Sequence, residues 1–315
     1  MTVAIGLGLS ECLFSDAAGY WRWVDMCEEG GVDSLWQTDR LVGPQPMLEC
    51  MSVMAALAGR TRRIKFGMNV VSLALRDPVL VAKQCATIDF LSGGRLLPAF
   101  GIGSPLAPEW QALGVETRTR GRKTDEALDI ISRLWREDHV DYAGRYFQLS
   151  GASIWPRPVQ SNLPLWIGGG SDAAIRRTAR IGTGWIAGAE TPAKVATIIA
   201  GIRREVKAAR RHIDDDHFGA SIPFFFGDAT DPLLVKPMEA YRARTGHDAL
   251  AFFAVGTAET IIERIAAYVE AGVSKFILRP AAGTDAIALQ QTRRAIEEVL
   301  PVASTLFNAP SGKCS

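Results

Sequence analysis

Short apolar runs rich in β-branched residues alternate along the chain with longer segments whose apolar residues recur at helical spacing. The pattern predicts strands over residues 3–9, 34–38, 64–71, 95–100, 165–168, 184–187, 220–226 and 275–278. It predicts helices over residues 16–29, 48–57, 79–91, 123–135, 172–181, 192–211, 259–271 and 286–299. Each strand precedes a helix, so consecutive strands must pair in parallel. Eight such units predict an α/β fold in which the strands close into a (β/α)8 barrel, also called a TIM barrel.

An open, doubly wound sheet is the alternative arrangement of such units. Its usual Gly-x-Gly-x-x-Gly turn after the first strand is missing here, which favours the barrel. We expect a single domain over residues 1–315, with insertion loops near residues 103–122, 138–163 and 227–255. We expect all three insertions to follow strands, at the end of the barrel where active-site loops lie. Residues 138–150 have the pattern of a small β-hairpin.

The composition narrows the class of protein. The chain has 315 residues, of which 48% are hydrophobic, and a formal net charge of +1. These values exclude a disordered chain and argue against a general nucleic-acid binder, which carries a strong basic excess. We find neither a run of about 20 apolar residues nor a signal peptide, and the five cysteines form no Cys-x-x-Cys pair. We therefore expect a reduced cytoplasmic protein that acts on a small molecule, without a membrane or nucleic-acid partner.

A run of glycines is the sharpest local signal. The strand that ends at Gly168 is followed by Gly169, Gly170 and Ser171, and Ser171 is placed to cap the next helix. Glycines let a ligand approach the backbone, and the first amides of a helix attract an anion. The segment fits a phosphate-binding turn, but it fits a tight strand-to-helix turn equally well.

Other candidate ligand contacts stand at the carboxyl ends of expected strands, where barrel enzymes place their active sites. Arg279 ends the last strand, a position at which barrels often bind phosphate. The four histidines do not converge at strand ends, so we expect no metal site. The remaining strand-end candidates are Asp39, Arg40, Asn69, Val70, Gly103 and Ser104.

Several ordered segments resemble the bacterial luciferase-like monooxygenase superfamily, particularly its branch that uses the deazaflavin coenzyme F420. The likeness extends over nearly the whole chain. It rests on GVDSLW at 31–36 with Asp39, LAGRTRRIKFG at 57–67, ATIDFLSGGR at 86–95 and WPRPVQSNLPLWIGGG at 155–170.

The resemblance implies site residues as well as a fold. In this family a non-prolyl cis peptide at the end of the third strand supports the ring of the cofactor, and the corresponding bond here is Asn69–Val70. Asp39 matches an acid that contacts the cofactor, and Gly169, Gly170 and Ser171 match the phosphate turn. Arg279 lies near the terminal phosphate contact of the family. The resemblance further implies a homodimer.

Two departures from the family pattern bear on catalysis. Many members have His after the strand-two Asp, where this chain has Arg40, and some have an acid where this chain has Ser104. Arginine stays protonated and cannot act as a general base, but it can stabilise an anionic oxygen, a carboxylate or a nitro group. We therefore take Arg40 as the first catalytic candidate, and Glu109, in the 103–122 insertion, as the second.

Three functions fit the sequence. The first is an oxidoreductase that transfers a hydride between F420 and a small organic substrate. The second is a monooxygenase that uses O2 and reduced FMN supplied by a partner reductase. The third is a protein that binds a flavin or deazaflavin without turnover. A phosphate turn serves either cofactor, so the glycines do not separate them.

Overall fold

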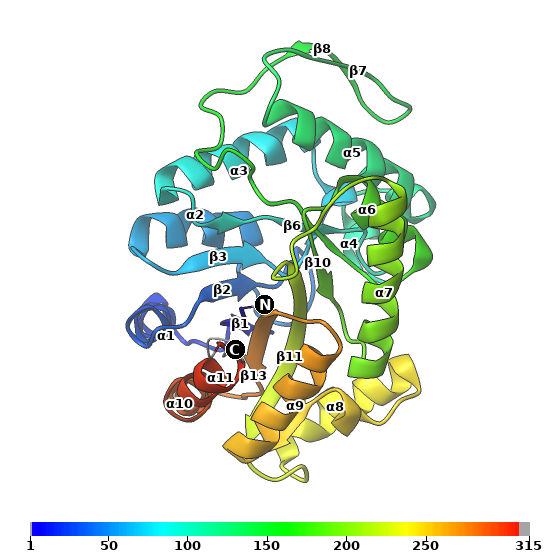
Figure 1. The fold of residues 1–315 in the computed structure, drawn as a ribbon. Coiled ribbons are helices and arrows are strands. Elements are labelled where there is room, and N and C mark those ends of the chain that lie inside the picture. Colours follow the sequence, from blue (N-terminus) through cyan, green and yellow to red (C-terminus); the bar gives the residue numbers. More distant parts are fainter. Residues whose placement is uncertain (1, 309–315) are drawn as a thin grey trace, which may run out of the picture.

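The computed structural model describes residues 2–308, and its parallel strands form a closed ring (Figure 1). Strands β3 (Lys65–Met68) and β4 (Val71–Ser72) are two pieces of one barrel strand, and so are β5 (Leu96–Leu97) and β6 (Ala99–Gly101). The ring closes because β3 pairs with β5 while β4 pairs with β6. The predicted (β/α)8 barrel is therefore confirmed. The ring consists of β1 (Ala4–Leu9), β2 (Ser34–Gln37), β3 (Lys65–Met68), β4 (Val71–Ser72), β5 (Leu96–Leu97), β6 (Ala99–Gly101), β9 (Trp166–Gly168), β10 (Gly184–Ala187), β11 (Phe218–Phe226) and β13 (Lys275–Pro280).

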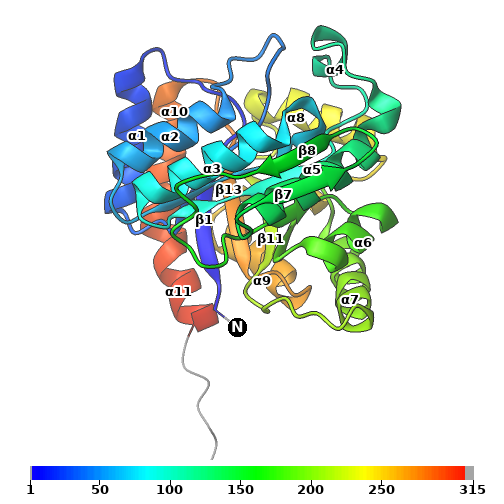
Figure 2. The same cartoon turned by 90° about the horizontal axis from the view of Figure 1, so that it is seen from above.

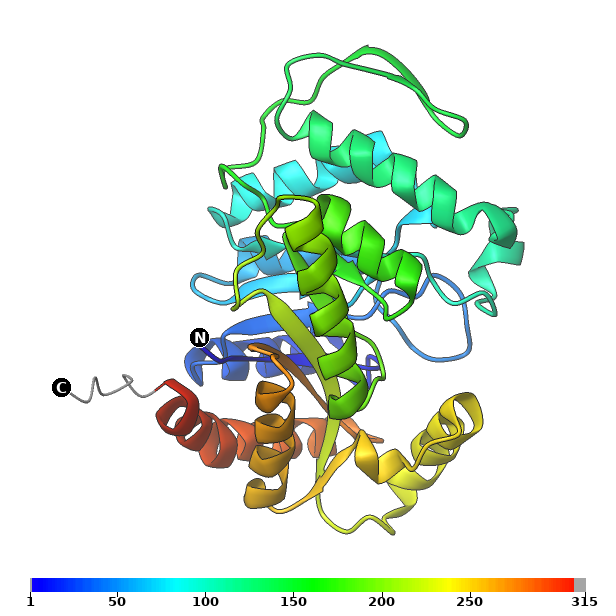
Figure 3. The same ribbon diagram turned by 45° about the vertical axis from the view of Figure 1, so that its right-hand side comes forward.

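Helices surround this ring on the outside, as a turned view also shows (Figure 3). Local signals place their ends: Ser171 caps α6 by accepting a bond from the amide of Ala174, and Gly93 ends α3 in the left-handed region at φ 66°. The helices that follow the barrel strands are α1 (Ala17–Glu29), α2 (Cys50–Arg60), α3 (Pro78–Ser92), α5 (Arg120–Leu134), α6 (Asp172–Ile181), α7 (Pro192–Ala208), α9 (Ala258–Glu270) and α10 (Asp285–Arg294), which continues through a π turn into α11 (Leu300–Asn308).

Two large rings fill the inside of the barrel. Trp36 and Trp166 meet edge to face there, with ring centroids 6.4 Å apart. Glycines on neighbouring strands make room for them: a Cβ on Gly67 would lie 2.7 Å from the ring of Trp36, and one on Gly184 would lie 2.6 Å from the ring of Trp166. Gly67 and Gly184 are therefore needed for the packing of the barrel interior.

Two of the three expected insertions lie at the carboxyl end of the barrel (Figure 2). They contain α4 (Glu109–Ala112) and α8 (Pro232–Thr245), together with β12 (Ala254–Gly256), which extends the sheet beside β11.

The placement predicted for residues 138–163 is wrong, because this segment follows a helix, α5, rather than a strand. The expected hairpin exists, as β7 (Val140–Ala143) and β8 (Gln148–Ala152). It lies on the outer surface of α5, where Glu126 accepts bonds from the amides of Arg145, Tyr146 and Phe147 (Figure 1). Within the described residues, no helix is long and apolar enough to cross a membrane.

Candidate active site at the barrel mouth

A cavity of about 890 Å³ opens at the carboxyl ends of the strands. We call it the mouth cavity. Its walls come from the ends of β1, β3, β10, β11 and β13 and from α8, and no residue of 138–163 lines it. This is the end of the barrel at which enzymes of this architecture bind their ligands. Of the residues predicted as ligand contacts, Asn69 and Arg279 line this cavity.

The peptide bond between Asn69 and Val70 is cis, as the resemblance implied. The Nδ2 group of Asn69 donates a hydrogen bond to Oγ of Ser221 at 2.9 Å, and both residues line the mouth cavity. The side chain of Val70 packs between two strand-end glycines. A Cβ on Gly101 would lie 2.8 Å, and one on Gly168 2.9 Å, from Cγ2 of Val70. These contacts hold the Asn69–Val70 segment, which we call the Asn69–Val70 bulge, at the floor of the mouth cavity.

Arg279 brings a positive charge into the mouth cavity, and no carboxylate of residues 2–308 forms an ion pair with it. One terminal nitrogen, Nη1, donates to Oγ of Ser10 at 2.8 Å, whereas the buried Nε has no partner among the described residues. Burial lowers the pKa of Arg279 to about 10, and the nearby charge of Arg244 adds to this. Arg244 and Lys236, both on α8, line the same cavity. An anionic group bound here would relieve the mutual repulsion of these cations.

The three glycines at the end of β9 each have a structural reason. Gly168 makes room for Val70, and Gly169 has φ 110° and accepts a bond on its carbonyl from Trp185 Nε1 at 2.8 Å. A Cβ on Gly170 would lie 2.7 Å from Oε1 of Glu190. The start of α6 favours an anion at this turn, whereas the carboxylate of Glu190 opposes one. None of these glycines, nor Ser171, lines the mouth cavity.

Asp39 is occupied by protein partners. Its carboxylate accepts bonds from Arg76 at 2.6 and 2.9 Å and from the amide of Ser72 at 2.9 Å, and its side chain is 2% exposed. The pKa of Arg76 is raised, because this pairing outweighs its burial. In this structure Asp39 fastens the end of β2 to β4, outside the residues that line the mouth cavity.

The two catalytic candidates meet beside the mouth. Arg40 Nη1 lies 3.5 Å from Oε1 of Glu109, which also accepts a bond from the amide of Leu41 at 3.2 Å. Glu109 is 3% exposed, and its other oxygen, Oε2, has no hydrogen-bond partner in the described chain. The structure thus brings together two residues that are far apart in sequence, although neither lines the mouth cavity.

The loop after β6 holds Glu109 in this position. Gly103 has φ 70°, and a Cβ on it would lie 2.9 Å from the ring of Trp110. The carbonyl of Ser104 accepts a bond from Trp110 Nε1 at 2.7 Å. Gly103 and Ser104 therefore position α4, which carries Glu109.

Sequence reasoning missed the aromatic wall of the mouth cavity. Tyr241, Phe252 and Phe253 line it and pack against one another, with Tyr241 stacked on Phe252 at 5.0 Å between ring centroids. The helix that positions this wall had readable signals, because Asp231 caps α8 before Pro232 and Gly246 ends it at φ 71°.

Comparison with known proteins gives a consistent picture. The profile of the family described as luciferase-like monooxygenase matches residues 14–248. An uncharacterised protein of Mycobacterium tuberculosis is 34% identical over 218 residues, which cover 61% of this chain and 74% of that protein. An F420-dependent glucose-6-phosphate dehydrogenase of Amycolatopsis mediterranei is 29% identical over 203 residues, and this match spans only 59% of that enzyme's length and 60% of this chain.

Solved structures share the fold at low sequence identity. An F420-dependent secondary alcohol dehydrogenase in complex with an F420–acetone adduct has a TM-score of 0.81 at 19% identity, over 96% of this chain and 99% of that one. The oxygenating constituent of 3,6-diketocamphane monooxygenase from Pseudomonas putida, in complex with FMN, has a TM-score of 0.77 at 17% identity, over 95% and 98%. Together with the family match, which covers well over half of the chain, these results show that the protein belongs to the luciferase-like monooxygenase family of oxidoreductases.

Proposed function

We propose that the protein is an oxidoreductase that binds coenzyme F420 in the mouth cavity and transfers a hydride between it and a small organic substrate. The cofactor supplies the redox chemistry when bound. The chain's own residues bind and orient the two reactants and limit the access of water.

One observation carries this proposal: the mouth cavity has a tightly packed floor and, in its wall, a buried arginine that pairs with no carboxylate of the described residues. The floor is the Asn69–Val70 bulge, locked by Gly101 and Gly168. The charge is Arg279, whose buried Nε has no partner in the described chain. A planar ring on the floor and an anionic group at Arg279 fit these features, and the volume of about 890 Å³ accommodates a cofactor with part of a substrate.

The sequence relatives favour F420 over FMN. Several relatives with an assigned activity are F420-dependent glucose-6-phosphate dehydrogenases, from organisms such as Amycolatopsis mediterranei and Nocardia farcinica. Because these matches span only about half to three-fifths of those enzymes, their substrate is not carried over to this chain.

A flavin monooxygenase is the second candidate. Structures similar to this chain include a monooxygenase constituent in complex with FMN, and such an enzyme would need reduced flavin from a partner reductase. Binding of the cofactor without turnover is the third possibility that the experiment below addresses.

Titration of the purified protein with F420 and, separately, with FMN tests the cofactor assignment. We expect binding of F420 at micromolar concentration and binding of FMN that is at least tenfold weaker. Tight binding of FMN with none of F420 would contradict the proposal. Tight binding of F420 without hydride transfer to any member of a panel of aldehydes, ketones, alcohols and nitroaromatic compounds would favour the non-catalytic alternative.

The walls of the mouth cavity suggest how the substrate is held. Tyr241, Phe252 and Phe253 offer an apolar surface, and Lys236 and Arg244 on α8 place positive charge at its rim. Arg40 lies beside the mouth cavity, at the position where the resemblance places a histidine in many family members, and we propose that it stabilises negative charge on the substrate. These features favour a substrate with an apolar body and a polar or anionic end.

We also propose a homodimer, formed through the outer face of α2 and α3. Before the exposed Arg60 at its end, α2 exposes small residues only, which are Ser52, Ala55, Ala56 and Gly59. Beside them on α3, Leu80 and Leu91 are 57% and 62% exposed. Small residues on one helix and protruding leucines on the next are complementary to a second copy of the same face turned about a two-fold axis.

Light scattering coupled to size-exclusion chromatography tests the dimer. We expect the unmodified chain to elute as a dimer and Leu91→Glu to elute as a monomer, because the charge would be buried at the interface. Val302→Glu is the matched control, since Val302 is 47% exposed on α11, away from this face. A monomeric unmodified chain, or a dimeric Leu91→Glu variant, would contradict this interface.

A further inference from the structure

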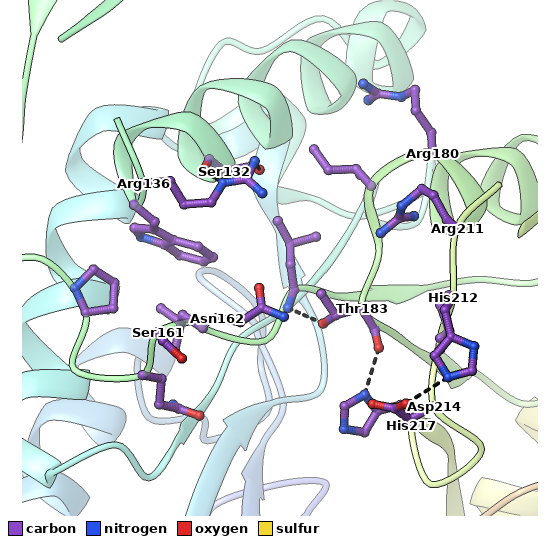
Figure 4. A pocket seen from close by; sticks show the side chains of 17 residues that line it. Ser132, Arg136, Ser161, Asn162, Arg180, Thr183, Arg211, His212, Asp214 and His217 are labelled. Atoms are coloured by element: carbon purple, nitrogen blue, oxygen red, sulfur yellow. Dashed lines mark hydrogen bonds and ion pairs between the residues drawn. The ribbon is translucent and has the colours of Figure 1, made fainter. Parts of the chain in front are cut away.

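A second cavity, of about 370 Å³, lies at the opposite end of the barrel (Figure 4). Leu165 and Thr183, which directly precede β9 and β10, line it, so it lies at the amino ends of the strands. Its other walls are the end of α5, the end of α6, the segment before β9 and the loop between α7 and β11. We call it the base cavity.

Two arginines reach the base cavity without a carboxylate partner. Arg136 comes from the end of α5 and Arg211 from the loop after α7, on opposite sides of the cavity (Figure 4). In the part of the chain that the structure describes, neither forms a salt bridge, whereas Arg180 on the same wall pairs with Asp129. Burial lowers the pKa of Arg211, and the charge of Arg136 lowers it further. The two cations therefore destabilise each other across the cavity.

Contacts with helix ends account for only part of their hydrogen-bonding capacity. Arg211 donates to three carbonyls at the end of α6, those of Thr178 at 3.3 Å, Ala179 at 2.6 Å and Gly182 at 2.8 Å. Arg136 donates from Nε to the carbonyl of Ser132 at 3.0 Å and from Nη2 to its Oγ. A guanidinium has five N–H groups, so both arginines retain donors for a ligand.

The remaining polar groups of the base cavity suit an oxyanion. The side chains of Ser161 and Asn162 line the cavity below the two arginines in the view of Figure 4, with Ser161 farther from Arg211. Nδ1 of His217 lies 2.9 Å from the carbonyl of Thr183 and donates a hydrogen bond to it, which leaves Nε2 as the other polar atom of the ring. The one carboxylate that lines the cavity belongs to Asp214, and it already pairs with His212 at 2.9 Å.

We propose that the base cavity binds phosphate or a small phosphate monoester between Arg136 and Arg211, with Asn162 as a neutral hydrogen-bond donor. Arginine forks are well suited to the oxygens of phosphate. This site lies at the opposite end of the barrel from the mouth cavity, and the inference does not depend on which cofactor the mouth binds. A bound anion would connect the ends of α5 and α6 with the loop before β11.

Thermal unfolding and calorimetric titration with inorganic phosphate, at constant ionic strength set with sodium chloride, test the site. The experiment uses the Arg279→Gln chain, which removes the buried cation of the mouth cavity, and the base-cavity variants below are made in the same background. We expect phosphate to raise Tm with a saturable dependence on concentration. Arg136→Gln should weaken phosphate binding at least tenfold, and Asn162→Asp should do the same by placing a carboxylate in the cavity.

Two further measurements separate a ligand site from a purely structural role. Asn162→Asp should raise Tm in the absence of phosphate, because the new carboxylate supplies the missing charge, and circular dichroism checks that both variants fold. Arg293→Gln, on α10, is the matched control, since Arg293 is an exposed arginine outside the base cavity, and it should leave phosphate binding unchanged.

Two results would overturn the proposal. One is that phosphate stabilises the protein no more than sodium chloride of equal ionic strength, or stabilises all variants equally. The other is that Mg²⁺ or Zn²⁺ stabilises the protein and phosphate does not. Asp214, Asp216 and His217, at the edge of this cavity, each offer one ligand atom within 4.8 Å of the others, so that result would point to a cation instead.

Discussion

Strand β13 carries a positively charged residue near each end, and the two residues differ in the partner that each one contacts. Lys275 begins the strand and is 6% exposed, and its Nζ forms an ion pair with the carboxylate of Asp33. Arg279 lies near the other end, on the same side of the strand, and it donates a hydrogen bond to the hydroxyl of Ser10. Among the residues that the structure describes, the cation at the base of the barrel pairs with a carboxylate, whereas the cation at the mouth does not.

This difference separates a residue that holds the fold from one that awaits a ligand. A buried charge is costly unless it is paired, so an unmatched one indicates either a stability loss or a function. At Lys275 the pair is complete. At Arg279 the neighbouring Arg244 makes the local charge more positive, and the cavity in front of it admits an anion.

Breaking the Asp33–Lys275 ion pair at the base of the barrel should have the largest effect, which is a loss of folding stability. Asp33→Asn leaves Lys275 buried without a counter-charge and should lower the free energy of unfolding by about 3–5 kcal/mol. Lys65→Ala is the matched control, because Lys65 is 53% exposed and 3.9 Å from the same carboxylate, and we expect a loss of about 0–1 kcal/mol. Urea denaturation at pH 7 measures both, and equal losses would remove the distinction between the paired and the peripheral lysine.

The same pair predicts how stability depends on pH. Burial alone would raise the pKa of Asp33, but the charge and hydrogen bond of Lys275 outweigh it and hold the pKa below its ordinary value. The stabilisation is therefore present above the unfolded pKa of about 3.9 and is lost as the pH falls through the folded pKa. Asp33→Asn should flatten this part of the stability curve.

Removing the unmatched charge at the mouth should affect binding rather than folding. Arg279→Gln should weaken binding of the anionic cofactor by about 10- to 100-fold, the range expected for a charge-assisted hydrogen bond. We expect its Tm to be equal to or higher than that of the unmodified chain. Arg279→Lys should recover part of the affinity. If Arg279→Gln bound the cofactor with full affinity but had a lower Tm, we would conclude that Arg279 has a structural role like that of Lys275.

Arg40 is intermediate between the paired Lys275 and the unpaired Arg279. Its distance of 3.5 Å to Glu109 is long for an ion pair, and its side chain is 41% exposed. We expect Arg40→Ala to lower turnover about tenfold, which corresponds to about 1.4 kcal/mol of transition-state stabilisation. Steady-state kinetics with the identified substrate, together with cofactor titration, measure the two effects separately. Arg40→Lys should keep part of the activity. Unchanged turnover in Arg40→Ala would argue against a catalytic role.

The eight repeating units could be predicted from the sequence because strand and helix periods are local signals. Helix ends were readable for the same reason, since caps such as Ser171 act within a few residues. The side on which residues 138–163 lie was predicted wrongly. Their turn residues and alternating pattern indicate a hairpin. Because the segment follows the helix α5 and precedes the strand β9, it lies at the amino ends of the strands, opposite to the mouth cavity.

The candidate site was only partly accessible from sequence, because its geometry depends on long-range contacts. The strand-end rule found Asn69 and Arg279, which line the mouth cavity. It did not find the wall of Tyr241 and Phe252, since α8 folds back over the mouth from an insertion. It also gave no reason for Gly168, whose need for a small side chain comes from Val70, nearly a hundred residues earlier.

The packing of Val70 between Gly101 and Gly168 has a consequence for how this family diverges. A methyl group added at either glycine would lie less than 3.0 Å from Val70, so alanine at 101 or 168 requires Val70 to move or to become smaller. We expect these positions to covary in an alignment of related chains, with alanine at 101 or 168 accompanied by a smaller residue at 70. The depth of the mouth cavity at the Asn69–Val70 bulge would then depend on three positions that change together during evolution. A redesign of this cavity should therefore vary positions 70, 101 and 168 together.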